Sequence, residues 1–308
     1  MRRTILSILL GLSAWAAGFG SWAGETACWF DHGAIVVPGA FGDIAGDFLL
    51  DPATPTSQLN ATNAQMFGIV TPTARADLRL AGERLPGFEM TAIDLGARER
   101  PFAAGLVGVI GADALSGFIT EIQTEPCRLR LSRRAGRRWP IRLPLKVIGG
   151  AFAVPAAVSD GATTRAGWFA VATGQPGVTV ADARLTRDPP KNADPDWPPA
   201  RLRALSLGDL LFEQVPAGIT DPPAPGLAGS LGEDIWWRFR MRLDPAHGRL
   251  ELEPLSSPLP IGRTSLPVFA AIIHPDTALA KERAAVLESN PVDSSALREE
   301  VEGVAAAG

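Results

Sequence analysis

The sequence predicts an all-β protein made of two similar lobes, and three observations support this prediction. The chain repeats itself at a constant offset. Gly (32) and Pro (27) are both abundant among the 308 residues, which favours short strands and turns over long helices. Several segments alternate apolar and polar residues with the period of a β-strand. Hydrophobic residues make up 46% of the chain, so a substantial core can form.

The repeat appears in paired segments that lie 121 positions apart. Residues 48–51 match residues 169–172, so that Asp51 corresponds to Ala172 (172 − 51 = 121). The glycine-rich stretch 105–111 matches 226–232 in the same way. Such self-similarity indicates that one lobe was duplicated and fused.

The repeat divides the chain into parts. Residues 28–131 are expected to form an N-terminal lobe and 148–254 a C-terminal lobe, joined by a basic linker at 132–147. Residues 255–308 form a tail that is helix-prone over 277–289 and has no counterpart in the first lobe. A proline-dense insertion at 188–199 is expected to be a surface loop of the second lobe.

Strands are expected in order along the first lobe. Their predicted positions are 34–37, then 47–51 after a glycine-rich turn at 41–47, then a hairpin over 77–85 that turns at Ala81-Gly82, then 119–131.

Residues 1–23 have the pattern of a secretory signal peptide. Arg2-Arg3 precedes an uncharged apolar run, and Ser21-Trp22-Ala23 is a small-x-small cleavage site. We therefore expect export to the periplasm or beyond. An uncleaved signal acting as a membrane anchor is the alternative, although the apolar run is short for spanning a bilayer.

Export bears on the two cysteines, Cys28 and Cys127. An oxidising compartment favours a disulfide between them. That bond would close a loop of about a hundred residues and stabilise the fold by up to about 4 kcal/mol. Two unpaired buried thiols are the alternative.

Eight basic residues and no acidic ones occur from Arg128 to Lys146. Contact with an anionic surface would account for this run. A solvated β-ribbon accounts for it as well, because the basic residues alternate with Leu129, Leu131 and Leu143. We favour the ribbon, since the alternation needs no partner.

Each lobe combines a strand ending at position 51 or 172 with a later glycine motif, which in the first lobe runs Gly-x-x-Gly-x-Ile-Gly-x-Asp over 105–113. This combination resembles one lobe of a pepsin-type or retropepsin-like aspartic protease. The resemblance covers roughly residues 34–254. It implies two lobes, each a small closed β-barrel, with a peptide-binding cleft between them.

The catalytic triplets that the resemblance implies are altered. The family pattern is Asp-Thr/Ser-Gly, once in each lobe. The first lobe reads Asp51-Pro52-Ala53, which keeps the acid and loses its supports. The second lobe reads Ala172-Thr173-Gly174, which keeps the supports and loses the acid.

The mechanism that the resemblance implies needs two carboxyl groups that share one proton. Ala172 supplies none, and Pro52 lacks an N–H and a hydroxyl. We therefore expect Asp51 to be vestigial, and the protein to be an inactive pseudo-protease that binds an extended peptide or a protein partner in its cleft. The alternatives are an active endopeptidase that pairs Asp51 across a homodimer or with Asp182 or Asp209, and a purely structural envelope protein.

Other chemistry finds little support in the sequence. His32, His247 and His274 have no ligand spacing, so we expect no metal site. There is no phosphate-binding glycine loop, and we expect no cofactor. The net charge of −4 gives no case for a nucleic-acid partner.

Two local motifs are assigned to the fold. Ser230 lies one residue short of a nucleophile-elbow pattern, but Val109 stands at its repeat position. In Trp236-Trp237, one ring is expected to pack inward and the other to lie at the surface.

Overall fold

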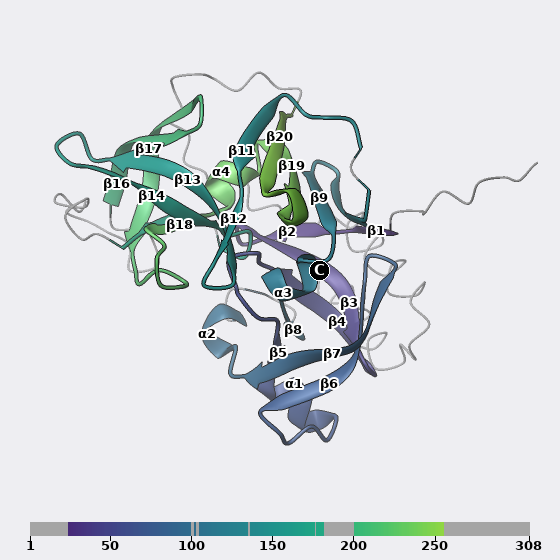
Figure 1. Cartoon of the computed structure of the whole chain (residues 1–308). Coiled ribbons are helices and arrows are strands. Elements are labelled where there is room, and N and C mark those ends of the chain that lie inside the picture. The colour runs from purple at the N-terminus through teal and green to yellow at the C-terminus, as the bar shows by residue number, and fades with distance from the viewer. Residues whose placement is uncertain are drawn as a thin grey trace, which may run out of the picture.

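The computed structural model describes residues 24–99, 102, 105–134, 136–175, 177–181 and 200–255 (Figure 1). Strands dominate this part of the chain, so the all-β prediction is confirmed. None of the described helices is long and apolar enough to cross a membrane. The predicted signal peptide, the proline-dense insertion and the helix-prone part of the tail lie outside the described residues.

The first lobe is a barrel. Its elements are β2 (Trp29–Asp31), β3 (Ala34–Phe41), β4 (Ile44–Leu50), β5 (Gln58–Asn60), α1 (Ala61–Met66), β6 (Thr73–Leu80), β7 (Glu83–Ile93), α2 (Gly96–Glu99), β8 (Gly108–Ile110) and α3 (Ala112–Leu115). The strands form one sheet in the order β2-β3-β4-β8-β5-β7-β6, and a pairing of β3 with β6 closes it. The turn between β6 and β7 lies at Ala81-Gly82, where both residues have positive φ (48° and 75°), as predicted.

The second lobe has the same topology. Its elements are β12 (Lys146–Ile148), β13 (Ala151–Ser159), β14 (Thr164–Val171), β15 (Val178–Val180), β16 (Ala200–Leu207), β17 (Leu210–Ile219), β18 (Gly229–Leu231) and α4 (Glu233–Trp236). The strand order β12-β13-β14-β18-β15-β17-β16 matches that of the first lobe, and β13 pairs with β16 to close the barrel. The two-lobed, double-barrel prediction is therefore confirmed.

Strand register shows where the repeat keeps its offset and where it does not. Phe48 pairs with Gly108 and Phe169 with Gly229, so both members of the second pair lie 121 positions after those of the first. The offset is different between β7 and β17. Thr91 of β7 pairs with Gln58, and Gly218 of β17 pairs with Thr179, which is the repeat counterpart of Gln58, so Thr91 corresponds to Gly218. That separation is 127 positions, so the connections of the two lobes differ in length although their barrels agree.

A third sheet joins the lobes. Its strands are β1 (Gly24–Ala27), β9 (Ile119–Thr124), β10 (Cys127–Ser132), β11 (Ile141–Pro144), β19 (Phe239–Asp244) and β20 (Arg249–Pro254), with a short 3-10 turn, η2 (Pro245–His247), after β19. The order is β1-β10-β9-β19-β20-β11, so three strands come from each side. Residues 132–147, expected as a linker, thus also supply β11 to this sheet and β12 to the second barrel.

The pseudo-twofold axis passes through the middle of the joining sheet. Glu121 of β9 lies directly opposite Arg242 of β19, its own repeat partner 121 positions later. The neighbouring pairs are mirrored about them, with Thr120 opposite Leu243 and Ile122 opposite Met241. The duplicated lobes are therefore held together by the same strand meeting its own copy.

A row of alternating charges crosses the joining sheet. The residues in register from one edge to the other are Glu25, Arg130, Glu121, Arg242, Glu251 and Arg142. Such cross-strand neighbours share one face of a sheet, so opposite charges stabilise the pairing. The basic run therefore supplies two of the cations of this row, which the solvated-ribbon interpretation did not foresee.

Arg242 is the buried centre of this row. Its guanidinium lies 2.8 Å from Glu121 and 2.8 Å from Glu251. It also donates to the Arg137 carbonyl at 2.6 Å and lies 4.1 Å from the centre of the Trp139 ring. Residues 137–139 of the basic segment thus cover the outer side of the sheet.

The predicted disulfide is confirmed. The Cys28 and Cys127 sulfur atoms are 2.01 Å apart, and the two residues are 99 positions apart in sequence. Cys28 follows β1 and Cys127 begins β10, so the bond closes the whole first lobe onto the joining sheet. In the chain-entropy description a loop of this length corresponds to about 4.7 kcal/mol, somewhat more than the value of about 4 kcal/mol expected from the sequence.

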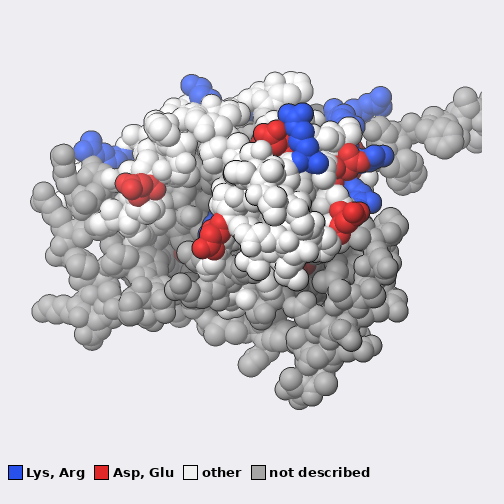
Figure 2. Space-filling view, turned by 90° about the horizontal axis from the view of Figure 1, so that it is seen from below, with Lys and Arg blue, Asp and Glu red and all other residues white. Residues whose placement is uncertain are grey.

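Charges on the surface are mixed in sign. In the view of Figure 2, acidic and basic side chains lie beside one another and do not gather into a patch of one sign. Arg75 with Glu89 and Arg84 with Asp77, both on β6 and β7, are examples of such exposed pairs.

We expect Arg242→Met to lower the free energy of unfolding by about 3–5 kcal/mol, because the variant removes the buried cation that lies 2.8 Å from both Glu121 and Glu251 and leaves Glu251 with only the more distant Arg142 (3.6 Å) and Arg249 (4.0 Å). The control is Arg240→Met on the same strand, where the pair with Glu253 is 38% and 39% exposed and is worth at most about 1 kcal/mol. Denaturant unfolding measures both losses. Equal losses in the two variants would contradict a special role for the buried cation.

Candidate functional site

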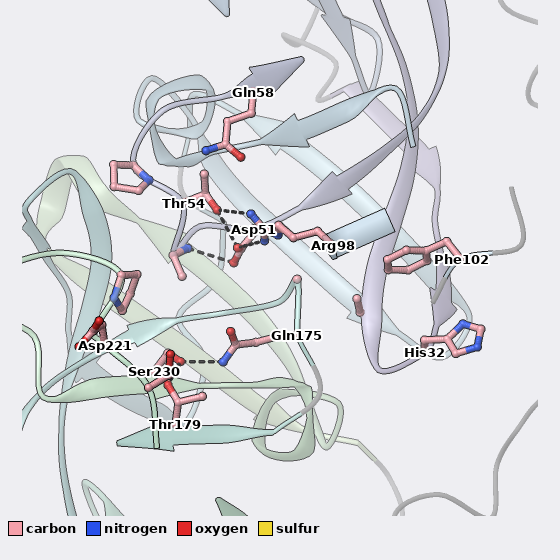
Figure 3. A pocket seen from close by; sticks show the side chains of 16 residues that line it. His32, Asp51, Thr54, Gln58, Arg98, Phe102, Gln175, Thr179, Asp221 and Ser230 are labelled. Carbon is pink, nitrogen blue, oxygen red and sulfur yellow. Dashed lines mark hydrogen bonds and ion pairs between the residues drawn. The ribbon is translucent and has the colours of Figure 1, made fainter. Parts of the chain in front are cut away.

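A cleft of about 460 Å³ lies between the two barrels (Figure 3). The first lobe contributes Asp51, Thr54, Gln58 and the segment carrying Arg98. The second lobe contributes the following lining residues: Gly174, Gln175, Thr179, Thr220, Asp221, Pro223 and Ser230. Of the positions that the sequence indicated as a degenerate site, Asp51, Ala53 and Gly174 line the cleft, whereas Pro52, Ala172 and Thr173 do not.

Backbone hydrogen bonds hold positions 51 and 172 in equivalent places. The Asp51 N–H donates to the Ile110 carbonyl at 2.9 Å, and the Ala172 N–H donates to the Leu231 carbonyl at 2.9 Å. Both acceptors end the short strand after the glycine motif, β8 or β18. The two loops thus keep the same backbone course, although only the first carries a carboxyl group.

The two loops are tied to each other across the axis. The Thr173 hydroxyl donates to the Leu50 carbonyl at 2.5 Å. The Ile35 N–H donates to the Thr173 carbonyl at 2.8 Å, and the Phe152 N–H donates to the Pro52 carbonyl at 3.0 Å. Pro52, the counterpart of Thr173 in the first lobe, has no side-chain hydroxyl and cannot donate an equivalent bond to the second loop. The side-chain hydrogen bond between the loops is therefore made by Thr173 alone.

Asp51 is an ion-paired and almost fully buried carboxylate. Its Oδ2 accepts from Arg98 Nη2 at 2.6 Å and from the Thr54 hydroxyl at 2.8 Å, and its Oδ1 accepts from the Ala53 N–H at 3.3 Å. Arg98 Nη1 also donates to the Thr54 hydroxyl at 3.1 Å. The Asp51 side chain is 7% exposed, and Figure 3 shows the Arg98 side chain directly beside it at the cleft.

Arg98 comes from a connection that is longer in the first lobe. The offset between the lobes is 127 at β7 and β17 but returns to 121 at β8 and β18. The chain between β7 and β8 is therefore six residues longer than its counterpart (127 − 121 = 6). Helix α2 lies in this connection and carries Arg98.

Ala172 lies among small apolar side chains. Its buried cluster contains five further residues of this kind, Ala53, Ala151, Ala153, Ala170 and Ala224, together with Leu227. Gly174, two residues on, has no room for a side chain, since a Cβ there would lie 2.8 Å from Asp51 Cβ and 3.0 Å from Arg98 Nη2. The second loop therefore offers Asp51 no acidic partner.

A second carboxyl group is buried behind the floor of the cleft. Glu233, the first residue of α4, is 2% exposed, and its N–H donates to the Gln175 carbonyl at 2.9 Å. Its two carboxyl oxygens have no hydrogen-bond partner in the described part of the chain. Burial, and then the charges of Asp234 and Asp51, raise the pKa of Glu233 well above its usual range.

The other residues that the sequence analysis considered for catalysis have structural positions or lie away from the cleft. Asp209 lies in the exposed turn between β16 and β17 and does not line the cleft, and Asp182 falls outside the described residues. Ser230 is buried and accepts from Gln175 Nε2 at 2.7 Å, next to the Thr179 hydroxyl at 2.6 Å. Its position in β18, bonded to neighbours within its own lobe, agrees with the fold assignment.

The Trp236-Trp237 pair and the histidines were also considered in the sequence analysis. Trp236 is fully buried and Trp237 is 43% exposed, as predicted for this pair. His32 lies at the cleft, His247 lies 2.8 Å from Asp244 Oδ1, and His274 is outside the described residues. No group of three or more potential metal ligands occurs among the residues that the structure describes.

Thr54, Arg98 and Glu233 are the site residues that the sequence analysis missed. Thr54 directly follows the degenerate triplet, and this position next to the triplet could have indicated a role in the site. Glu233 replaces Ala112 of the first lobe at a buried motif position, so the repeat itself could have drawn attention to it. Arg98 carried no such signal, because its connection is six residues longer than the counterpart in the second lobe and the repeat therefore gives it no matching position.

Comparison with known proteins agrees with the fold. No family model matches the chain, and no curated protein matches it. Among solved structures, the crystal structure of an aspartic proteinase from Irpex lacteus is similar with a TM-score of 0.50 and 13% sequence identity. The match covers 76% of this chain and 98% of that one. The chain therefore has the fold of a pepsin-like aspartic proteinase.

The pH dependence of stability should report Glu233. Because its pKa is raised in the folded chain, the folded state keeps a proton that the unfolded state releases near pH 4.5. The contribution of Glu233 to the free energy of unfolding should be largest below that pH and should fall by up to about 1.4 kcal/mol per pH unit as pH rises through the folded pKa. Glu233→Gln should remove this fall.

Chemical unfolding of both proteins from pH 4 upward checks this expectation. Glu89→Gln is the matched control, because the Glu89 side chain is 53% exposed. Curves for the wild type and Glu233→Gln that stay parallel over the whole range would show that Glu233 does not bind the proton.

Proposed function

We propose that the protein is a catalytically inactive relative of the aspartic proteases in fold, which binds an extended peptide or a protein segment in the cleft between its lobes. The observation that carries this proposal is the environment of Asp51. Its carboxylate is paired with Arg98 at 2.6 Å, and the equivalent position in the second lobe is Ala172. The cleft is present, but the second-lobe position equivalent to Asp51 carries no carboxyl group.

Two physical reasons support inactivity. A proton-sharing pair of carboxyl groups divides the roles of activating water and polarising the scissile carbonyl, and one carboxyl group cannot fill both. The guanidinium of Arg98 also covers Asp51, whose side chain is 7% exposed. Loss of one member of a cooperating catalytic set costs several orders of magnitude in rate.

The alternative of an active endopeptidase meets a structural obstacle. In a homodimeric pairing a second copy would have to present its own Asp51 to the first. The place opposite Asp51 is already filled by the second lobe of the same chain, whose Thr173 bonds to Leu50. Glu233, the buried carboxyl group behind the floor, does not line the cleft.

We also propose that the protein is exported. The support is the N-terminal signal pattern of the sequence together with the Cys28–Cys127 disulfide. Disulfides persist in oxidising compartments and are rare in the cytosol.

A peptidase assay tests the first half of the proposal. The purified mature protein should not cleave a denatured protein substrate between pH 3 and pH 7 (roughly the working range of carboxyl dyads), and Asp51→Asn should behave like the wild type. A pepstatin-type inhibitor should bind weakly, because its hydroxyl needs two carboxyl groups. Pepstatin-sensitive turnover that disappears in Asp51→Asn would establish the active alternative.

A binding assay tests the second half. Thr220 is exposed and lines the cleft, so Thr220→Trp should narrow the cleft and weaken retention of extended peptides by about tenfold or more. Thr164→Trp is the matched control, because Thr164 is exposed in the same lobe but does not line the cleft. Equal peptide retention by both variants would place binding outside the cleft.

A further inference from the structure

We infer that the cleft selects ligands that carry a carboxylate, and that Arg98 is the residue that receives it. This inference rests on the proposed peptide-binding function and specifies the ligand class. It uses three features of the described residues: the free hydrogen-bonding capacity of Arg98, the distribution of charge along the cleft, and the uncharged polar walls between the charged ends.

Arg98 has N–H donors that its contacts with Asp51 and Thr54 do not use. A guanidinium carries five N–H groups in a planar fork, and the interactions with Asp51 and Thr54 use one on each Nη atom. The side chain is 34% exposed and lines the cleft. A planar fork with free N–H groups matches a carboxylate in shape and charge, and such charge-assisted bonds are among the strongest in proteins.

The charges are separated along the cleft. Figure 3 shows Arg98 and Phe102 on one side of Asp51 and Asp221 on the other. The Phe102 ring packs edge-on against His32 with ring centres 6.0 Å apart, which helps to hold the connection carrying Arg98. Asp221 is exposed at the opposite end. An acidic group on a ligand is thus attracted to one end of the cleft and repelled from the other.

Uncharged polar groups line the cleft between these ends. Gln58 comes from the first lobe and Gln175 from the second. The Gln58 Oε1 atom is buried and has no hydrogen-bond partner among the described residues. A rotation of the Gln58 side chain towards the cleft would let this acceptor bind a backbone N–H of an extended peptide, as buried polar atoms require a partner. The walls therefore favour a peptide backbone, while Arg98 selects its acidic group.

Asp51 has a defined role in this arrangement, since it is the counter-ion that Arg98 holds when no ligand is bound. A ligand carboxylate must share the guanidinium with Asp51, and the two negative charges repel each other. Removing the charge of Asp51 should therefore strengthen the binding of a carboxylate. This expectation is opposite to that of any catalytic role, in which loss of Asp51 abolishes function.

Three pools of random octapeptides test the inference. None contains aspartate or glutamate except where stated. The first pool has an amidated C-terminus, the second has a free C-terminal carboxylate, and the third is amidated with one fixed glutamate. Retention of each pool on the immobilised protein is measured by mass spectrometry, for the wild type, Arg98→Gln, Asp51→Asn and the control Arg75→Gln, whose side chain is 74% exposed on β6.

The wild type and Arg75→Gln should retain at least one carboxylate pool about tenfold or more above the neutral pool. The second and third pools tell whether the carboxylate is a C-terminus or an acidic side chain. The preference should disappear in Arg98→Gln and grow in Asp51→Asn. Thermal melting confirms that each variant is folded.

The outcomes separate this inference from the proposed function. Equal retention of all three pools, lost in Thr220→Trp, would overturn the carboxylate selectivity and leave peptide binding in place. A carboxylate preference that survives Arg98→Gln would also overturn it. Retention of no pool by any variant would overturn peptide binding itself, and the selectivity with it.

Discussion

The pairing of β9 with β19 is the constraint on which the rest of the structure depends. Glu121 lies opposite its own repeat partner Arg242, so the two barrels are locked about a single axis. Loops that leave equivalent strands must then face each other across that axis, and positions 51 and 172 do so. The Cys28–Cys127 bond fastens the first lobe to the same sheet. The cleft is thus a consequence of the scaffold and does not require any particular chemistry at its floor.

The two lobes differ where the chain leaves this scaffold. The barrels keep one strand order, while the connection between β7 and β8 is six residues longer than the one between β17 and β18 (127 − 121 = 6). Connections tolerate such changes because they lie at the surface and carry few of the contacts that hold the core. The extra length in the first lobe places Arg98 over Asp51. A small change in one loop therefore alters the chemistry of the cleft without altering the fold.

The features that the sequence could predict are those with a local or repeated signal. The Ala81-Gly82 turn follows from the residues that tolerate positive φ. The double barrel follows from the repeat, and the disulfide follows from the presence of two cysteines in a chain that we expect to be exported. These predictions needed no knowledge of which distant residues meet.

The features that the sequence could not predict depend on distant contacts. Arg98 lies 47 positions from Asp51, in a connection without periodicity or a repeat partner. The alternating row around Arg242 depends on the register of six strands, and a shift of one residue would have turned these charges to the other face. The basic run of the linker had a visible alternation, but its acidic partners come from both lobes and only the folded sheet brings them together.

The pairing of Asp51 with Arg98 compensates for the absence of a carboxyl group at the equivalent position, Ala172. A buried carboxylate is costly unless it is paired or hydrogen-bonded. In a symmetric site a second carboxyl group can share a proton and relieve this cost, but Ala172 cannot. Arg98 supplies the compensation instead, and Gly174 leaves the space in which the guanidinium lies, since a Cβ there would come within 3.0 Å of it. The Asp51 carboxylate in turn holds the Arg98 guanidinium at the cleft between the two lobes.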